Sequence, residues 1–136
     1  MALNKKAVTH ANSLIKNDKV DTKSSWSFSA DDGNELLGED GDDWRNYGKW
    51  FLMINPEANE ETKAHYKFPF GKNDKVYRSG LTAIRQRAAQ FGYDDIFDEA
   101  GKLIEKIDEK DKKEKLEQLL HQLVNKIKDI LYYGRK

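Results

Sequence analysis

The segment that most constrains the fold is residues 26–108, where aromatic and turn-forming residues recur at irregular spacing. All three tryptophans and both prolines fall inside it, together with most of the glycines. A simple helical repeat would not place large rings and turn residues in this way. The segment therefore predicts one specifically packed unit that mixes helices, turns and short strands.

Composition narrows the class of protein further. A chain of 136 residues corresponds to one domain with room for an appendage, and its 11% aromatic content argues against disorder. The formal net charge is zero, so bulk charge points to neither nucleic acid nor a membrane surface. The absence of cysteine excludes disulfides, thiolate metal sites and a cysteine nucleophile. No apolar run has the length of a signal peptide or membrane span, so we expect a cytoplasmic protein with no membrane partner.

Apolar periodicity predicts four helices within the first 108 residues, at about 4–17, 43–54, 80–91 and 95–107. Alternating residues predict a β-hairpin, with residues 66–70 returning through 76–78, and a short strand at 26–28. The expected class is therefore α+β, mostly α-helical with four to five helices and a small antiparallel hairpin or three-stranded sheet, in a single domain over residues 1–108. The expected core comprises Leu14, Trp44, Phe51, Phe68, Leu81, Ile84, Ile96, Leu103 and Ile107.

Residues 109–136 are predicted to form a separate amphipathic helix. We call the five apolar residues that recur at spacings of four and three the tail seam: Leu116, Leu120, Leu123, Ile127 and Ile130. Leu119, Val124 and Leu131 widen it. A heptad seam is typical of coiled coils, although about two heptads are few, and a wide stripe is also typical of a helix packed on its own domain. Packing on the preceding helix and self-association through the seam both remain open.

A second candidate surface lies in residues 63–87, where cations alternate with aromatic rings. Cations contact phosphates and exposed rings stack on bases, so this composition suits nucleic acid as well as a protein partner. The opposing interpretation is that the rings fill the core while the cations pair with the acidic loop at residues 31–43. The candidate residues are Tyr66, Lys67, Phe70, Lys72, Lys75, Tyr77, Arg78, Arg85 and Arg87.

No catalytic or metal-binding pattern is recognisable. The acidic loop fails the calcium-loop pattern, because Leu36 stands where glycine is required, and its aspartates are better explained as helix caps. His10, His65 and His121 lie on different predicted elements. A His65–Ser79 pair is conceivable across the hairpin, but Ser79 is not in a nucleophile elbow and is better explained as a helix cap. We therefore expect no catalytic residues, no bound metal and no cofactor.

Several longer motifs resemble a known family. W-S-F-S-A-D-D-G-N-x-L-L-G, D-W-x-x-Y-x-x-W-F-L, T-K-x-x-Y-K-F-P and V-Y-R-S-x-L-x-A-I-R-x-R-A-A-Q are similar to a small module of tailed-bacteriophage and prophage proteins, found within or beside prohead (head-maturation) proteases and other head-morphogenesis proteins. The resemblance covers about residues 11–108. It implies a mobile-element origin and an accessory or interaction role, but not protease activity, because the protease would need its own larger domain.

The function expected from these observations is a non-enzymatic, phage- or prophage-derived interaction or structural module. Its partner is expected to be another protein, with a phage-encoded protein and a homo-oligomer through the C-terminal helix as two options. The alternative is a nucleic-acid-binding protein that uses residues 63–87.

Overall fold

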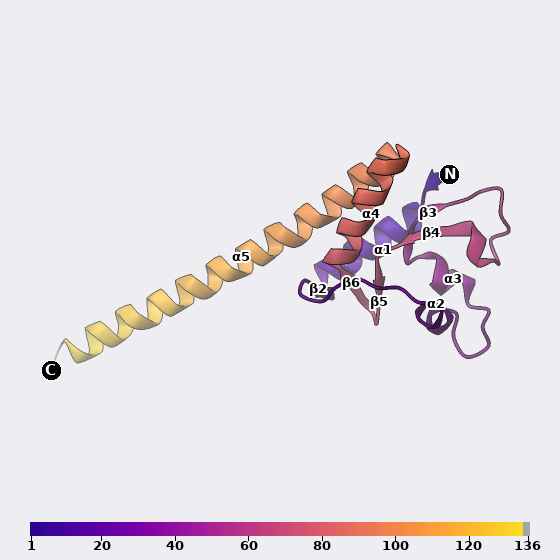
Figure 1. Ribbon diagram of the computed structural model, residues 1–136. Helices are drawn as coiled ribbons and strands as arrows, with labels where there is room; N and C mark the ends of the chain where they lie inside the picture. The colour runs from indigo at the N-terminus through magenta and orange to yellow at the C-terminus, as the bar shows by residue number, and fades with distance from the viewer. Residues whose placement is uncertain (135–136) are drawn as a thin grey trace.

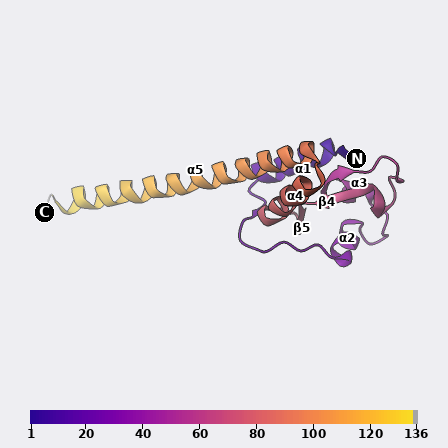
Figure 2. The ribbon, with the colours of Figure 1, turned by 45° about the horizontal axis from the view of Figure 1, so that its top comes forward.

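A computed structural model describes residues 1–134 and shows a small domain from which one long helix projects (Figures 1 and 2). The domain contains helices α1 (Lys5–Lys16), α2 (Ala30–Leu36), α3 (Trp44–Gly48) and α4 (Arg78–Phe91). The projecting helix is α5 (Asp94–Tyr133). A short 3-10 helix, η1 (Lys63–His65), lies directly before the strand β4 (Tyr66–Pro69). Mostly helical α+β architecture, as predicted, is confirmed.

Two three-stranded sheets complete the domain. In the first, β3 (Phe51–Ile54) lies between β1 (Ala2–Leu3) and β4 (Tyr66–Pro69), and both neighbours run antiparallel to it. In the second, β6 (Lys75–Tyr77) lies between β5 (Gly71–Lys72) and β2 (Val20–Asp21). The β5–β6 pair is antiparallel, whereas β2 runs parallel to β6. A hairpin does return through β6, but its first strand is β5 (Gly71–Lys72), which the prediction placed in the turn. The predicted pairing of residues 66–70 with 76–78 is wrong for residues 66–69, because these pair with β3 in the other sheet.

The segment at 43–54 differs from its prediction. It was expected to be one helix, but α3 ends at Gly48 and β3 begins at Phe51. Gly48 packs under an aromatic ring, since a Cβ atom there would lie 2.7 Å from the Tyr66 ring. Residues 26–28 were expected to form a strand, yet they have no regular structure and contribute Trp26 and Phe28 to the packing of their neighbours.

The core lies where the two sheets meet α1, α4 and the first four turns of α5. Phe70, Leu52, Leu81, Leu103 and Val76 are the largest fully buried side chains. Seven of the nine predicted core residues are buried, while Trp44 and Phe68 are only partly buried at its edge. Burying such side chains contributes roughly 1.5–3 kcal/mol each, so this cluster is the main source of stability.

Asn4 ties the start of the chain to the first sheet. Its side-chain amide donates to the backbone carbonyls of Gly48, at 2.8 Å, and Phe51, at 2.9 Å, and its backbone N–H donates to Leu52 at 2.8 Å. These bonds satisfy a buried polar side chain and two carbonyls at the α3–β3 junction. They join residues more than forty positions apart.

The α4–α5 hairpin sets the direction of the projecting helix. Gly92 ends α4 in the left-handed conformation, with φ of 73°, and Tyr93 begins α5. The predicted end of a helix at Gly92 is confirmed. The predicted helix at 95–107 does not stop at the charged run that follows, because α5 continues through it to Tyr133. A helix of 40 residues is about 60 Å long.

Candidate functional site: the exposed face of the C-terminal helix

The C-terminal half of α5 carries a continuous apolar face that nothing covers. We call the tail seam together with Leu119, Val124 and Leu131 the tail stripe. Its eight side chains are between 47% and 69% exposed. From Lys112 to the end of the described chain, every residue is exposed. Isolated exposed leucines are ordinary, but a contiguous apolar stripe on a protruding element is typical of an interaction site.

Within the described residues, this segment touches its own domain only near its start, where Lys110 donates to the Ile15 and Lys16 carbonyls and Glu114 hydrogen-bonds to Asp18. Beyond these contacts the helix extends away from the domain, so that the last described turn of α5 is its part furthest from the domain in both views (Figures 1 and 2). The last buried residue of α5 is Ile107. Residues 115–134 are exposed and do not pack on the domain in this structure, so of the two alternatives for residues 109–136 self-association through the tail seam stays a prediction. The two remaining residues lie outside the described range.

The tail stripe faces away from the side of α5 that packs on the domain. Ile96, Ala100, Leu103 and Ile107 are the buried residues of α5. At 100° per residue, the mean direction of the tail stripe lies roughly 160° from the mean direction of these four residues. A partner on the tail stripe would therefore approach from the side opposite the domain.

The aromatic rings of the segment 63–87 are largely inside the protein. Phe70 is fully buried against Trp50, and Tyr77 is buried against Trp26. Tyr66 is half-buried beside Trp44, and its hydroxyl donates to the Glu60 carbonyl at 2.8 Å. Base stacking requires an exposed ring face. The core interpretation of these rings is the one that the structure supports.

Several cations of the same segment have partners within the chain. Lys72 pairs with Asp32 at 3.0 Å, where both side chains are mostly shielded from solvent. The Arg78 guanidinium donates twice to Asp108, with both distances 2.8 Å. The basic segment thus contacts the acidic loop of the same chain, through Lys72 and Asp32.

The remaining cations do not form a common surface with Tyr66, Phe70 and Tyr77, although Lys67 and Arg87 line one shallow cavity with the rings of Phe68, Phe91 and Tyr93. Arg85 lies 4.4 Å from the centre of the Phe97 ring, and Arg87 lies 5.6 Å from that of Phe91. Lys67 and Lys75 are exposed on β4 and β6, in different sheets. The predicted nine-residue binding surface is therefore divided between the core, ion pairs and separate faces.

The histidine and serine side chains do not form a hydrolytic pair. His65 is buried, with Nδ1 at 2.9 Å from the Ala58 carbonyl. The Ser79 hydroxyl donates to the Ser24 carbonyl at 2.8 Å. His10 contacts the Trp50 ring edge-on, and burial, aided by Lys49, lowers its pKa. Each group therefore has a packing or hydrogen-bonding role in the fold.

The first part of the predicted acidic loop is in fact the helix α2, and two of its aspartates act at helix starts; the predicted cap at Asp43 is confirmed. Ser29 and Asp32 form a reciprocal capping box at the start of α2, and Asp43 accepts from the Asn46 N–H at the start of α3. Hydrogen bonds from Ser29 and Lys72 lower the pKa of Asp32. Among residues 1–134, no group of three or more acidic or histidine side chains is placed to hold a metal ion.

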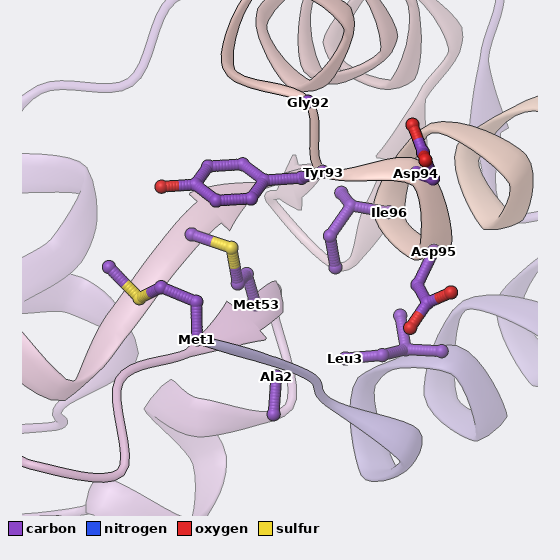
Figure 3. Close-up of a pocket in the computed structure, with 9 residues that line it drawn as sticks. All are labelled: Met1, Ala2, Leu3, Met53, Gly92, Tyr93, Asp94, Asp95 and Ile96. Carbon is purple, nitrogen blue, oxygen red and sulfur yellow. The ribbon is translucent and has the colours of Figure 1, made fainter.

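A shallow cavity of about 280 Å³ lies at the α4–α5 turn (Figure 3). The side chains of Met1 and Met53 lie near the Tyr93 ring, and Asp94 and Asp95 lie at the start of α5. These carboxylates already balance the positive end of the helix dipole, so the cavity does not suit an anion. Sequence reasoning missed this cavity, because it joins residues from β1, β3 and the α4–α5 turn.

No family model, curated protein or solved structure matches this chain. The resemblance to a phage head-morphogenesis module therefore stays a prediction. Within the described residues, no helix combines the length and apolar character needed to cross a bilayer.

Proposed function

We propose that this protein is a non-enzymatic interaction module of phage or prophage origin, which acts in the cytoplasm and joins its globular domain to another protein through α5. The single observation that carries the proposal is the tail stripe, whose side chains are 47% to 69% exposed on a helix that extends away from its own domain.

The physical argument starts from the cost of leaving this face in water. The eight aliphatic side chains of the tail stripe each leave about half of their surface in water. Burying that apolar surface would release roughly 25 cal/mol per Å². A partner helix that covers the stripe recovers that free energy. The helix is continuous with a packed domain, so the ordering cost that weakens the binding of free peptides is reduced.

The non-enzymatic part of the proposal draws on the roles of the candidate groups. His65 and Ser79 are engaged in hydrogen bonds that shape the fold, as are Asp32 and Asp43 of the acidic loop. Nucleic-acid binding by residues 63–87 has less support, since it would need Phe70 and Tyr77 to leave the core.

The test is an affinity capture from cells that carry the gene in its native setting, with nuclease added. Tagged wild type is compared with Leu123→Asp, which puts a charge in the tail stripe, and with Gln118→Asp, which puts the same charge on the opposite face of α5. We expect a protein partner that resists nuclease, is lost with Leu123→Asp and is kept with Gln118→Asp.

Two results would contradict the proposal. One is a captured partner that binds wild type and Leu123→Asp equally. The other is a hydrolase activity of the purified protein that Ser79→Ala or His65→Ala abolishes. Partners that are lost on nuclease treatment would instead favour nucleic-acid binding by residues 63–87.

A further inference from the structure

We infer that the occupant of the tail stripe is another copy of this chain, arranged parallel and in register. This inference rests on the proposed function, because it names the partner of the same surface. Four observations carry it: the order of the seam residues, the residues that flank them, the area of the stripe and its direction relative to the domain.

The first observation is the order of the seam residues. Leu116, Leu123 and Ile130 occupy d positions of a heptad, and Leu120 and Ile127 occupy a positions. A parallel in-register pair brings each of the five against its own counterpart and forms five apolar layers. An antiparallel pair has two possible registers, and each keeps only four apolar layers. In one register the next layer sets Ile130 against Lys113 of the second copy, and in the other it sets Leu116 against Gly134.

The second observation is the identity of the flanking residues. In a parallel pair, each g position faces the e position five residues later in the other copy. Lys112 then faces Glu117, which is an attractive pair, and Leu119 faces Val124, which extends the apolar contact. Lys126 faces Leu131, whose surface its aliphatic stem can cover. No like charges meet at these positions.

The third observation is the area. Eight aliphatic side chains at 47% to 69% exposure present on the order of 700 Å² per chain, close to the roughly 800 Å² that each partner contributes to a standard interface. The stripe also spans about 140° of the helix surface, wider than the seam of a strict a/d coiled coil. That width allows more than two helices to share the interface.

The fourth observation is that the domains do not obstruct the pairing. The tail stripe and the domain-facing residues lie on opposite sides of α5, so the domains point outward from a shared axis. Between Ile107 and Leu116 lies a charged run that contains Lys113 at an a position. Two facing Lys113 side chains repel each other, so Lys113 adds no stability and the apolar contact begins one layer further along, at Leu116.

The first part of the test is the mass of the full-length chain in solution. Sedimentation equilibrium from about 1 μM to about 1 mM covers the affinity range expected for a short seam. We expect a rise from monomer to a defined oligomer for wild type and Gln118→Asp. For Leu123→Asp we expect monomer over the whole range, with the tryptophan near-UV circular dichroism of the domain unchanged.

The second part tests orientation, and the absence of native cysteine makes it direct. Lys113→Cys places one thiol at an a position, where a parallel pair brings the two copies within disulfide reach. Gln118→Cys places it on the outer face. Under mild oxidation we expect near-complete cross-linking of Lys113→Cys and at least tenfold less of Gln118→Cys. In an antiparallel pair with four apolar layers, the two Lys113 positions lie about 25 Å or about 36 Å apart along the axis, depending on the register.

The outcomes separate this inference from the proposed function. A monomer at all concentrations overturns self-association, and an oligomer in which Lys113→Cys cross-links no better than Gln118→Cys overturns the parallel arrangement. In either case, a partner captured from cells in a manner that depends on Leu123 leaves the proposed function standing. If that partner also binds Leu123→Asp, the proposed function fails independently.

Discussion

At the scale of single residues, close contacts between glycines and aromatic rings hold the two sheets in place. A Cβ atom on Gly71 would lie 2.3 Å from the Lys75 carbonyl oxygen and 2.8 Å from the Trp50 ring. Neither neighbour can move away easily, since one is backbone and the other is a buried ring. Gly101 differs, because its nearest neighbour is the flexible Arg85 side chain at 3.4 Å.

We therefore expect Gly71→Ala to destabilise the protein by about 2–3 kcal/mol, the cost typical of overpacking a core. Gly101→Ala, in the middle of α5, should be neutral or stabilising by up to about 1 kcal/mol, because alanine favours helix. Denaturant unfolding followed by tryptophan fluorescence measures both. Equal effects of the two substitutions would show that the contacts at Gly71 do not constrain the fold.

The polar residues show why some roles escape sequence analysis. Asp42 or Asp43 could be predicted as a cap, and Asp43 is one, because a cap acts within three residues of its position. Asn4 was not recognised as a structural residue, because its partners at Gly48 and Phe51 are distant in sequence. The individual cations were visible as candidates, but their pairing with Asp32 and Asp108 depends on the tertiary fold.

At the scale of elements, contacts from the start of α4 and the end of α1 hold α5 at the place where it leaves the domain. Arg78, the first residue of α4, holds Asp108 of α5 by two hydrogen bonds of 2.8 Å. Nearby, Lys110 donates to the Ile15 and Lys16 carbonyls at the end of α1. These contacts attach α5 to two other helices just before it enters solvent.

The Arg78–Asp108 pair predicts a specific pH dependence. Hydrogen bonding to Arg78 lowers the pKa of Asp108, so its contribution is present above its unfolded pKa of about 4 and is lost as pH falls through the lowered value. Both side chains are more than a third exposed, so we expect Asp108→Asn to cost only about 0.5–1 kcal/mol at pH 7. Urea unfolding at neutral pH and near pH 2.5 measures the difference.

The control is Asp111→Asn, which removes an exposed pair with Lys115 on the tail and should change the free energy of unfolding little at either pH. The difference between wild type and Asp108→Asn should shrink as pH falls through the lowered pKa of Asp108. A difference that stayed the same at both pH values would mean that Asp108 acts through packing instead of its charge.

The misassigned elements share a physical cause. Trp44, Tyr47, Phe51 and Ile54 recur at helical spacing, yet only the first two are in a helix. Residues 51–54 are hydrophobic throughout, and such a short run suits a strand covered on both faces as well as a helix. Pairing with β1 and β4 decides in favour of the strand, and those partners come from remote parts of the chain. Residues 26–28 lack such a partner.

At the scale of the whole molecule, the protein consists of a packed domain and a protruding helix whose two apolar faces point in opposite directions. Removing the chain after Lys113 should leave the free energy of domain unfolding within about 0.5 kcal/mol of wild type, measured at a concentration where both are monomeric. The reason is that residues 112–134 are fully outside the core. The helical circular dichroism signal per molecule should fall.

A shorter version is the control. Ending the chain after Lys106 removes the buried Ile107 together with Asp108 and Lys110, and should cost about 3 kcal/mol or more. If the version ending after Lys113 were destabilised as strongly, the tail would contribute to the fold of its own domain, contrary to the structure.

The sequence by itself determined the features that depend on near neighbours. Helical periodicity identified α1, α4 and both halves of α5, and glycine identified the end of α4, because these signals act over one or two helical turns. The tail stripe was equally visible, since it is a pattern along one helix.

Only the tertiary structure decided what those patterns face. An apolar stripe on a helix is buried only if the rest of the domain lies on the same side of that helix. Here the domain lies on one side of α5, and the tail stripe faces the opposite side. Whether aromatic rings that alternate with cations form a binding surface or a core likewise depends on residues that are remote in sequence. In this protein such residues cover Phe70 and Tyr77, so both rings are buried. Burial is a property of the assembled chain, and local spacing does not contain it.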